Sequence, residues 1–478
     1  MMIAQSLSPA LAYLIAEWAI RLGALLFIPF RRTPDSARAW LLLLLFLPVP
    51  GLLLYLLIGR PTYPRRRRAR LARAAELLQT AAEEIAHSRS CRQPVLSRNF
   101  RQAADLIERL GRFPALGSNN LNLLTDYEGV VSQLIADVDA AQHHVHILMY
   151  IFADDETGAL VVSALERAAA RGVACRVLVD AAGSRRWSRS LGKRFSAAGV
   201  AYAEALPIAP WRRRSARADL RNHRKIAVID GVIGYVGSQN IVNAAWAKGV
   251  VNEELVVRSV GPAVVAMQAV FAVDWFLGTE EVLEGERFFP HFGGSGAVTA
   301  QLMPSGPDYG EAGVGYLTVA LIHAARERVV ITTPYFIPDA ALLQALRTAV
   351  LRGVSVDLVV PYVSDQVLVR LAQQSYYTEL LDAGVRVHRY RDRFLHAKLI
   401  GIDEDISLIG SSNVDVRSFV LNAEVTLIVY DPQVSASLRL EQQRYIRASD
   451  HLTSDSWEQR SSVVKLFANV ARLVSPLL

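Results

Sequence analysis

The pattern of apolar and polar positions begins with two long apolar stretches. Pro9–Phe30 is interrupted by Glu17 and Arg21, and Ala39–Gly59 carries no charge. Each has about 20 residues, which at ~1.5 Å per residue spans a ~30 Å hydrocarbon core. Glu17 and Arg21 stand four residues apart and can pair, which lowers the cost of burying either charge. The pattern predicts a transmembrane helical hairpin over residues 1–60, with a kink at Pro48.

Two other interpretations of the first stretch are an interfacial helix and a signal peptide. No positive charge precedes the apolar run and a second run follows at once, so a signal peptide is disfavoured. Basic residues after a span favour the cytoplasmic side, which places the remainder of the chain there, although the arginines between the stretches argue the other way. The residues after the second stretch are Arg60, Arg65, Arg66, Arg67, Arg68, Arg70 and Arg73, and those between are Arg31, Arg32 and Arg38.

Beyond a helical linker, the chain alternates apolar strands with helices and does so twice. In the first copy the predicted strands are His146–Phe152 and Cys175–Asp180, and in the second they are Val329–Thr333 and Val356–Val360. Helices of this length between buried strands indicate an α/β fold with a largely buried sheet. We expect a juxtamembrane segment and linker at 61–115, a first half at 116–288 and a second half at 289–478.

Composition and charge narrow the class of protein. The 478 residues are 52% hydrophobic and 20% charged, which excludes a disordered or coiled-coil chain. Two distant cysteines, Cys91 and Cys175, exclude a disulfide framework and a thiolate zinc site. The net charge is +7, yet the first 75 residues alone hold eleven arginines against two acidic residues. The basic character therefore points to a membrane surface rather than to nucleic acid.

Each copy contains the same polar motif, H-x-K-x4-D-x6-G-S-x-N. The chain has only ten histidines, so two copies with identical tails are not a chance match. The residues are His223, Lys225, Asp230, Gly237, Ser238 and Asn240 in the first copy, and His396, Lys398, Asp403, Gly410, Ser411 and Asn413 in the second.

The spacing of the motif suggests chemistry on a phosphodiester. Side chains two apart on a strand share a face, so we expect each strand to present an imidazole and an ammonium to one site. Two copies face to face would surround an anion with two His, two Lys and two Asn, without a metal ligand set. One histidine can attack phosphorus while the other protonates the leaving oxygen. A histidine near its free pKa of ~6.5 can perform either task.

The duplicated motif resembles the HKD signature of the phospholipase D superfamily, and within it the chain is similar to the bacterial cardiolipin synthases over nearly its whole length. The resemblance implies two phospholipase D-like α/β/α sandwich halves sharing one active site. It also implies that a Glu after each motif orients a catalytic His; Glu254 and Glu424 match, although Glu253 beside Glu254 leaves the first assignment open. Asp230 and Asp403 are implied to be more structural than chemical. Further landmarks are Tyr150-Ile151-Phe152, Asp274-Trp275, Thr333–Pro338, and Asp415–Phe419 with Asn422.

By this resemblance the reaction is a two-step transfer between two phosphatidylglycerols. His223 is implied to be the nucleophile that forms a phosphatidyl-histidine and His396 the acid and base, although the sequence is symmetric on this point. Ser238, Asn240, Ser411 and Asn413 are expected to bind the substrate. No cofactor or metal is expected. The expected partners are phosphatidylglycerol and other anionic lipids, not nucleic acid, and the expected location is the inner membrane, as a multi-pass protein with a cytoplasmic catalytic region.

Other interpretations stay open at this point. A phospholipase D-type hydrolase, another phosphatidyltransferase or a membrane-tethered nuclease would share the histidine chemistry and differ in which acceptor reaches the site. A non-enzymatic lipid-binding protein is disfavoured because both motifs are complete. The arginine tract that runs from Arg212, Arg213 and Arg214 through Arg217 to Arg221 and Arg224 is either a headgroup contact or a solvated loop. His143, His144 and His146 lack a carboxylate at ligand spacing, so a strand start is favoured over a metal site.

Overall fold

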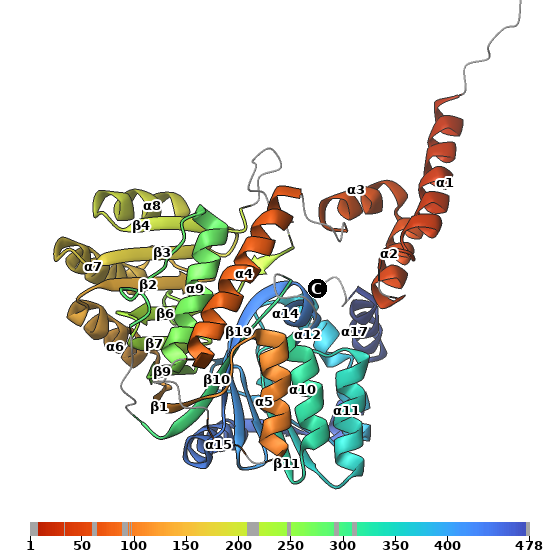
Figure 1. Cartoon of the computed structure of the whole chain (residues 1–478). Coiled ribbons are helices and arrows are strands. Elements are labelled where there is room, and N and C mark those ends of the chain that lie inside the picture. Colours follow the sequence, from red (N-terminus) through yellow and green to blue (C-terminus); the bar gives the residue numbers. More distant parts are fainter. Residues whose placement is uncertain are drawn as a thin grey trace, which may run out of the picture.

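The structure is a computed structural model in which a helical amino-terminal extension projects from a large α/β body (Figure 1). The expectations for the arginines at 212–217, Arg60 and Cys91 fall outside the described residues. The last two arginines of the tract, Arg221 and Arg224, are described and buried, so they do not belong to a solvated loop. The structure describes residues 8–32, 34–59, 65–87, 94, 96, 98–207, 219–245, 250–290, 296–307 and 313–474.

The first apolar stretch forms one exposed helix, α1 (Pro9–Phe27), in which no residue is buried. Ser8 caps it by accepting a hydrogen bond from the amide of Leu11. Glu17 and Arg21 form the predicted ion pair, with 3.2 Å between Oε2 and NH2. Among the described residues, α1 is the one helix long and apolar enough to cross a membrane.

The second apolar stretch departs from the sequence prediction. It is divided into α2 (Pro34–Phe46) and α3 (Pro48–Ile58), with Leu47 between them at φ −130° and ψ 71°. Pro48 lacks an amide hydrogen and its ring clashes with the preceding turn, so a helix cannot run through it. Each piece is shorter than a membrane span requires. The expected helical hairpin, and with it a multi-pass arrangement, is therefore not supported.

Sixteen strands of the described residues form one sheet, in which fifteen follow the order β20-β14-β13-β11-β16-β17-β19-β10-β1-β9-β7-β6-β2-β3-β4, and β5 pairs with β19. In the first half they are β1 (Leu116–Leu124), β2 (His144–Met149), β3 (Ala174–Asp180), β4 (Ala201–Ala205), β5 (Arg221–Asn222), β6 (Ile226–Ile229), β7 (Ile233–Gly237) and β9 (Val256–Val260). In the second half they are β10 (Val298–Ser305), β11 (Arg328–Thr332), β13 (Ser355–Pro361), β14 (Arg386–Tyr390), β16 (Leu399–Ile402), β17 (Ile406–Gly410), β19 (Asn422–Val429) and β20 (Ser449–Leu452).

The duplication in the sequence is a duplication of topology. The order β9-β7-β6-β2-β3-β4 in the first half corresponds to β19-β17-β16-β11-β13-β14 in the second. In the first half, β2, β3 and β4 run parallel to one another, and β6, β7 and β9 continue the sheet with antiparallel pairing. In the second half, β11, β13 and β14 are the parallel strands, and β16, β17 and β19 are the antiparallel ones. β1 and β10 pair antiparallel and join the halves into one sheet. The expected boundary at residues 288 and 289 falls in the connection before β10.

Helices cover the sheet on both faces, and its central strands, such as β6, β16 and β17, are almost wholly buried. The helices of the first half are α6 (Tyr127–Ala140), α7 (Glu156–Ala170), α8 (Ser188–Ala197) and α9 (Ala263–Thr279). Those of the second half are α10 (Gly313–Ala324), α11 (Ala340–Leu351), α12 (Val367–Gln374), α13 (Tyr377–Asp382), α14 (Val416–Val420), α15 (Pro432–Arg447), α16 (Ser454–Glu458) and α17 (Ser462–Val474).

The region expected to be a helical linker contributes to the body. α4 (Arg65–His87) packs against α9, and α5 (Arg98–Gly111) packs against β10 and α10. Leu78 on α4 and Ile107 on α5 are buried in the two main cores. Both helices therefore belong to the packed body, α4 beside α9 and α5 beside α10 (Figure 1).

Two short strand pairs complete the arrangement at the centre of the molecule. β8 (Asn252–Glu253) runs parallel to β15 (Phe394–Leu395), and β12 (Phe336–Ile337) runs parallel to β18 (Val414–Asp415). β5 is likewise parallel to the start of β19. The pairs β5–β19 and β8–β15 each join one half to the other, and each leads directly into a motif histidine.

Candidate active site

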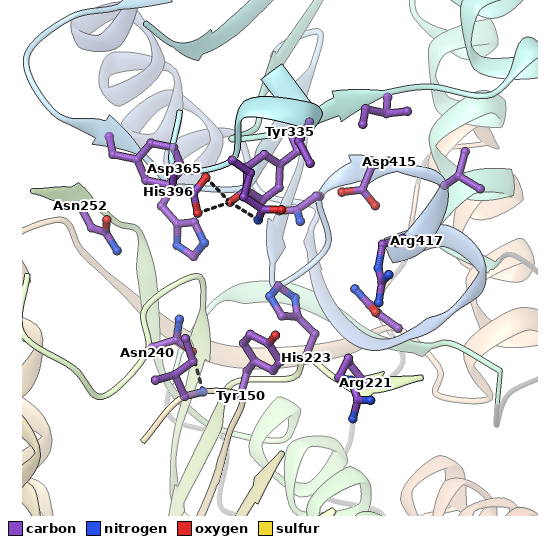
Figure 2. A pocket seen from close by; sticks show the side chains of 18 residues that line it. Tyr150, Arg221, His223, Asn240, Asn252, Tyr335, Asp365, His396, Asp415 and Arg417 are labelled. Carbon is purple, nitrogen blue, oxygen red and sulfur yellow. Dashed lines mark hydrogen bonds between the residues drawn. The ribbon is translucent and has the colours of Figure 1, made fainter. Parts of the chain in front are cut away.

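A cavity of about 420 Å³ lies where the two halves meet, lined by residues of both. Figure 2 shows the imidazoles of His223 and His396 turned toward the same space from opposite sides. Both side chains line this cavity within a single chain. The duplicated motifs therefore do meet at one site, as their spacing led us to expect.

His223 is held by the second half of the chain. Its amide donates to the carbonyl of Ala423 at 2.8 Å, because β5 pairs with the start of β19. Its ring nitrogen Nδ1 lies 2.9 Å and 3.0 Å from the two carboxylate oxygens of Glu424. The ring of Tyr150 packs edge-on against the imidazole, with 4.7 Å between the ring centroids.

His396 is held by the first half in the same way. Its amide donates to the carbonyl of Glu253 at 2.8 Å, and its Nδ1 lies 2.7 Å and 2.9 Å from the oxygens of Glu254. Phe394 stacks beside the ring. Glu253, the open alternative for this role, instead pairs with Arg444 and Arg393. The two glutamates thus serve the histidine of the opposite half.

These contacts and the burial of the site determine the protonation states of the two pairs, His223 with Glu424 and His396 with Glu254. Burial would raise the pKa of Glu254, but the charge and hydrogen bond of His396 lower it to about 2. Burial lowers the pKa of His223 to about 4 although Glu424 opposes the shift, and burial also lowers the pKa of His396. At neutral pH the carboxylates are therefore ionised and accept from Nδ1–H, which leaves an Nε2 lone pair on each neutral imidazole.

The lysines of the motif lie behind the histidines and do not line the cavity. His223 and Lys225 stand in the extended segment between β5 and β6 rather than on one strand, and the second motif lies likewise before β16. Lys225 Nζ donates to the carbonyl of His223 at 2.8 Å, and Lys398 Nζ to that of His396. Burial lowers the pKa of Lys225 to about 8 and that of Lys398 to about 7. The expectation that imidazole and ammonium share a face toward the substrate is not met here.

The motif aspartates lie away from the cavity and hold the ends of strands. Asp230 accepts hydrogen bonds from the amides of Gln142, His143 and His144, just before β2, at 2.7–2.8 Å. Asp403 accepts the equivalent bonds from residues 326–328, before β11. Both aspartates adopt positive φ, 53° and 51°. Each aspartate therefore ties the turn after its motif strand to the start of the neighbouring parallel strand, β2 in the first half and β11 in the second.

The serines expected to bind substrate contact protein groups instead. Ser411 Oγ donates to Glu424 Oε2 at 2.5 Å. Ser238 Oγ contacts the backbone of Leu255 and helps to lower the pKa of Glu254. Asn240 and Asn413, the other two expected residues, do line the cavity.

Two further asparagines line the cavity, Asn252 and Asn422, and the sequence analysis did not assign them to the site. Each stands two residues before a histidine-binding glutamate and contacts its Oε1, at 3.2 Å and 3.4 Å. The signal was available, because Asn-x-Glu occurs after both motifs. Four asparagine side chains therefore surround the two imidazoles.

A buried ion pair supports the first motif. Arg224, between the motif His and Lys, is fully buried and its NH1 lies 2.6 Å from both oxygens of Asp274 on α9. Its Nε donates to the carbonyl of Glu424, the residue that binds His223. Ala397 takes the equivalent place in the second motif. Arg224 thus links the histidine segment, its glutamate and the core helix.

The cavity is not symmetric, because equivalent positions carry different side chains. Arg221 and Phe394 each stand two residues before a motif histidine, and both line the cavity. Arg417 lines it from α14 and donates to the carbonyl of Asp219. On the other side, the Tyr335 hydroxyl donates to Asp365, and its ring lies against Phe394. The side of His223 therefore carries two arginines beside Tyr150. We call the side of His396, which carries Tyr335 and Phe394 but no arginine among the lining residues, the aromatic side (Figure 2).

No group of three or more His, Cys, Asp or Glu side chains that could hold a metal ion occurs among the described residues. His144 and His146, the pair that invited a metal interpretation, are packed against Phe288 and Phe271 in the core. Burial lowers the pKa of both rings.

Comparison with known proteins places this geometry in a family. The family model described as "Cardiolipin synthase, PLD-like domain" matches residues 134–275 and 318–445, one match in each half. A second, "Phospholipase_D-nuclease N-terminal", matches residues 19–60.

Curated relatives and a solved structure agree with these matches. Cardiolipin synthase A of Proteus mirabilis is 33% identical over 96% of this chain and 97% of its own length. Cardiolipin synthase A of Yersinia pseudotuberculosis is 34% identical over the same shares. The crystal structure of phosphatidylserine synthase from Haemophilus influenzae has the same fold, with a TM-score of 0.61 at 17% identity, over 80% of this chain and all of its own.

Proposed function

Because the chain belongs to the cardiolipin synthase family of phospholipase D-like proteins, we propose that it transfers a phosphatidyl group from one phosphatidylglycerol to another. The products are cardiolipin and glycerol. The observation that supports this most directly is that two imidazoles face one cavity, each held at Nδ1 by a carboxylate. This leaves one nitrogen for attack on phosphorus and another for proton transfer.

In the first step His223 Nε2 attacks phosphorus and the bond from phosphorus to the glycerol oxygen breaks. His396, in its protonated form, gives its Nε2 proton to that oxygen, and glycerol leaves. Burial disfavours protonated His396 in the empty cavity, but an anionic phosphodiester beside it favours the charged form. The imidazole of the covalent intermediate carries positive charge, which the adjacent Glu424 carboxylate stabilises.

In the second step the roles of His396 reverse. Its neutral Nε2 accepts the proton of a glycerol hydroxyl on the second phosphatidylglycerol, and that oxygen attacks phosphorus. The phosphorus–nitrogen bond breaks and His223 returns to its starting form. One phosphodiester replaces another, so the exchange needs no external energy source. Water competes for the intermediate, so the second lipid must be held in place and water largely excluded.

The cationic groups supply the field that an anionic substrate requires. Lys225 and Lys398 hold the carbonyls of the two histidines from behind and do not line the cavity. Burial lowers the pKa of both ammonium groups, and an anionic phosphodiester in the cavity favours their charged forms. Arg221 and Arg417 line the cavity beside His223, where they would neutralise phosphate oxygens. The asparagines Asn240, Asn413, Asn252 and Asn422 add neutral hydrogen-bonding groups around the phosphorus.

The protein is associated with a membrane, and its substrates are phospholipids. We place it in the inner membrane, anchored through α1, with the catalytic body on the cytoplasmic side. The arginine-rich segment after residue 60 favours that orientation. A reporter phosphatase fused after Arg73 tests it, since periplasmic activity of the fusion would reverse the orientation.

The decisive experiment supplies purified protein with phosphatidylglycerol in detergent micelles, in the presence of a chelator. Glycerol release and the lipid product are followed together. We expect equal amounts of glycerol and cardiolipin. Phosphatidic acid as the sole product would assign the protein as a hydrolase. Activity retained in His223→Ala or His396→Ala would contradict the mechanism.

The identity of the nucleophile is tested by trapping. Phosphatidylglycerol labelled in the phosphatidyl group is added to His223→Asn and to His396→Asn, and the denatured protein is examined for covalent label. We expect label in His396→Asn, which retains the attacking His223. Label found only in His223→Asn would reverse the two roles.

A further inference from the structure

The packing of α17 reverses the usual pattern of an amphipathic helix. Its buried side chains are small, Ala468 at 1% exposure and Ala471 at 2%. Its large apolar side chains face outward, including Leu466 at 62%, Phe467 at 59% and Leu473 at 62%. A surface helix of a globular protein buries its large apolar residues and exposes small or polar ones.

The outward residues form one stripe. Val463, Leu466, Phe467, Val470 and Leu473 are spaced by three and four residues, so they share a helix face, and all are at least half exposed. The flank of the helix carries Lys465 and Arg472, and Ser462–Val474 contains no acidic residue. Arg472 pairs with Glu379 on α13, with 2.9 Å between NH2 and Oε2, so the cationic group beside the stripe is Lys465. An apolar stripe with a basic residue at its edge and no acidic residue is typical of helices that lie in a membrane interface.

Exposed apolar residues continue onto the neighbouring element. α17 packs against α12, on which Val367 and Leu368 are 63% and 46% exposed. Tyr362 and Val363, in the segment before α12, are 49% and 43% exposed. We call the apolar stripe of α17 together with these four residues the α12–α17 face. It gathers nine exposed large apolar side chains on two adjacent helices and the segment before α12.

The same segment forms the rim of the cavity. Asp365, Gln366 and Val369, interspersed with the exposed residues of α12, line the space around the two motif histidines. Asp365 accepts the hydrogen bond of Tyr335 on the aromatic side of the site. Whatever covers the α12–α17 face therefore lies beside the entrance through which substrate reaches His396.

We infer that the α12–α17 face rests in the interfacial layer of a lipid bilayer and holds the cavity entrance against the lipid surface. The cavity of about 420 Å³ accommodates headgroups but not the acyl chains of two phospholipids, which must stay in an apolar phase next to it. α1, whose apolar side chains are exposed along its length, projects from the same side of the molecule as α17 (Figure 1). The reason for this contact depends on the proposed function, since it assumes a lipid substrate. The evidence for the contact is the set of exposed apolar residues and does not depend on the substrate.

A depth measurement tests the contact without reference to catalysis. Full-length Phe467→Trp protein is reconstituted in phosphatidylglycerol–phosphatidylcholine vesicles, some containing phospholipid brominated in the acyl chains. The emission of the parent chain is subtracted. The matched control is Leu440→Trp on α15, comparably exposed at 66% but on a helix away from α17 (Figure 1). We expect the bromolipid to quench the added indole of Phe467→Trp strongly and that of Leu440→Trp little. Equal quenching in the two variants would overturn the inference.

A kinetic measurement tests what the contact does. The variant Leu466→Ser/Phe467→Ser is compared with Leu440→Ser on phosphatidylglycerol in vesicles and on a short-chain phosphatidylglycerol below its critical micelle concentration. We expect the double variant to lose about a hundredfold in turnover on vesicles, about tenfold for each of the two large apolar groups removed, and to keep the parent rate on the soluble lipid. Equal losses on both lipids would remove the docking role.

Two further outcomes separate this inference from its alternatives. If the parent chain transfers no phosphatidyl group to either lipid, the proposed function fails while the depth measurement still decides the membrane contact. If the double variant instead converts a detergent-solubilised dimer to a monomer, and the added indole of Phe467→Trp is not quenched, the face is a contact between two copies of this chain.

Discussion

Glu424, from the second half of the chain, accepts a hydrogen bond from Nδ1 of His223 in the first half. Glu254 of the first half binds His396 of the second in the same manner. The two halves therefore exchange the groups that orient their histidines. Neither half holds a complete catalytic pair, so the halves form one site and not two.

We expect Glu424→Gln and Glu254→Gln to lower kcat by roughly 10²- to 10⁴-fold, as when a histidine loses the carboxylate that sets its tautomer. A glutamine amide can donate to Nδ1, which places the proton on Nε2 and removes the lone pair that faces the cavity. The measurement is glycerol release from phosphatidylglycerol. Glu253→Gln is the matched control, since Glu253 pairs with arginines. A similar loss in all three variants would contradict the assigned role.

Substitution of Asp230 or Asp403 by Ala is expected to affect folding more than catalysis. Each carboxylate satisfies three backbone amides, and an alanine at positive φ adds strain, so the free energy of unfolding should fall by about 2–4 kcal/mol. Denaturant titration measures that loss. The turnover per folded molecule should stay within about fivefold of the parent rate, because the loss is of stability and not of a catalytic group. A variant that folds normally but has no turnover would show that the aspartate takes part in catalysis.

Removal of Arg224 is expected to be among the most destabilising single changes in the body. Arg224→Ala leaves Asp274 as an unpaired buried charge, which costs about 3–5 kcal/mol of unfolding free energy. The exposed pair of Arg167 and Asp139 is the control, and Arg167→Ala should destabilise the protein far less, because solvent screens an exposed pair. Thermal unfolding in detergent compares the two. If Arg224→Met/Asp274→Leu unfolds as readily as Arg224→Ala, the unpaired charge is not the cause.

The buried His144 should make the protein less stable in acid. Burial lowers its folded-state pKa to about 4, while the unfolded-state value is about 6.5. Between these values the unfolded chain binds more protons, so the free energy of unfolding falls as pH drops from about 6.5 to about 4 and does not depend on this group above that window. The group contributes a slope of up to about 1.4 kcal/mol per pH unit.

His144→Leu should reduce that slope, whatever its effect on stability at neutral pH. The measurement is urea unfolding at several pH values between about 4 and about 8. An unchanged slope in His144→Leu would show that the ring titrates normally in the folded protein.

Much of the fold was predictable because its signals are local. Strand and helix alternation depends on the burial of neighbouring side chains, and the duplicated strands fell within a few residues of β2, β3, β11 and β13. The Glu17–Arg21 pair follows from helical spacing alone. Pro48 was expected to kink a helix, but a break at Leu47 divides the stretch into two helices too short to span. A proline in the sequence indicates where a helix is disturbed, but it does not indicate whether the helix bends or ends there.

The sequence by itself determined that two H-x-K-x4-D motifs exist, that each follows a strand of an equivalent half, and that phosphodiester chemistry suits them. Only the tertiary structure decided that Lys225 and Lys398 lie behind the histidines, that Ser411 contacts a glutamate, and that the glutamates are exchanged between halves. The exchange depends on the two-residue strand pairs β5–β19 and β8–β15. A strand pair of two residues is too short to produce a periodic hydrophobic pattern in the sequence. Its partner lies far away along the chain and is brought beside it only when the two halves pack against each other.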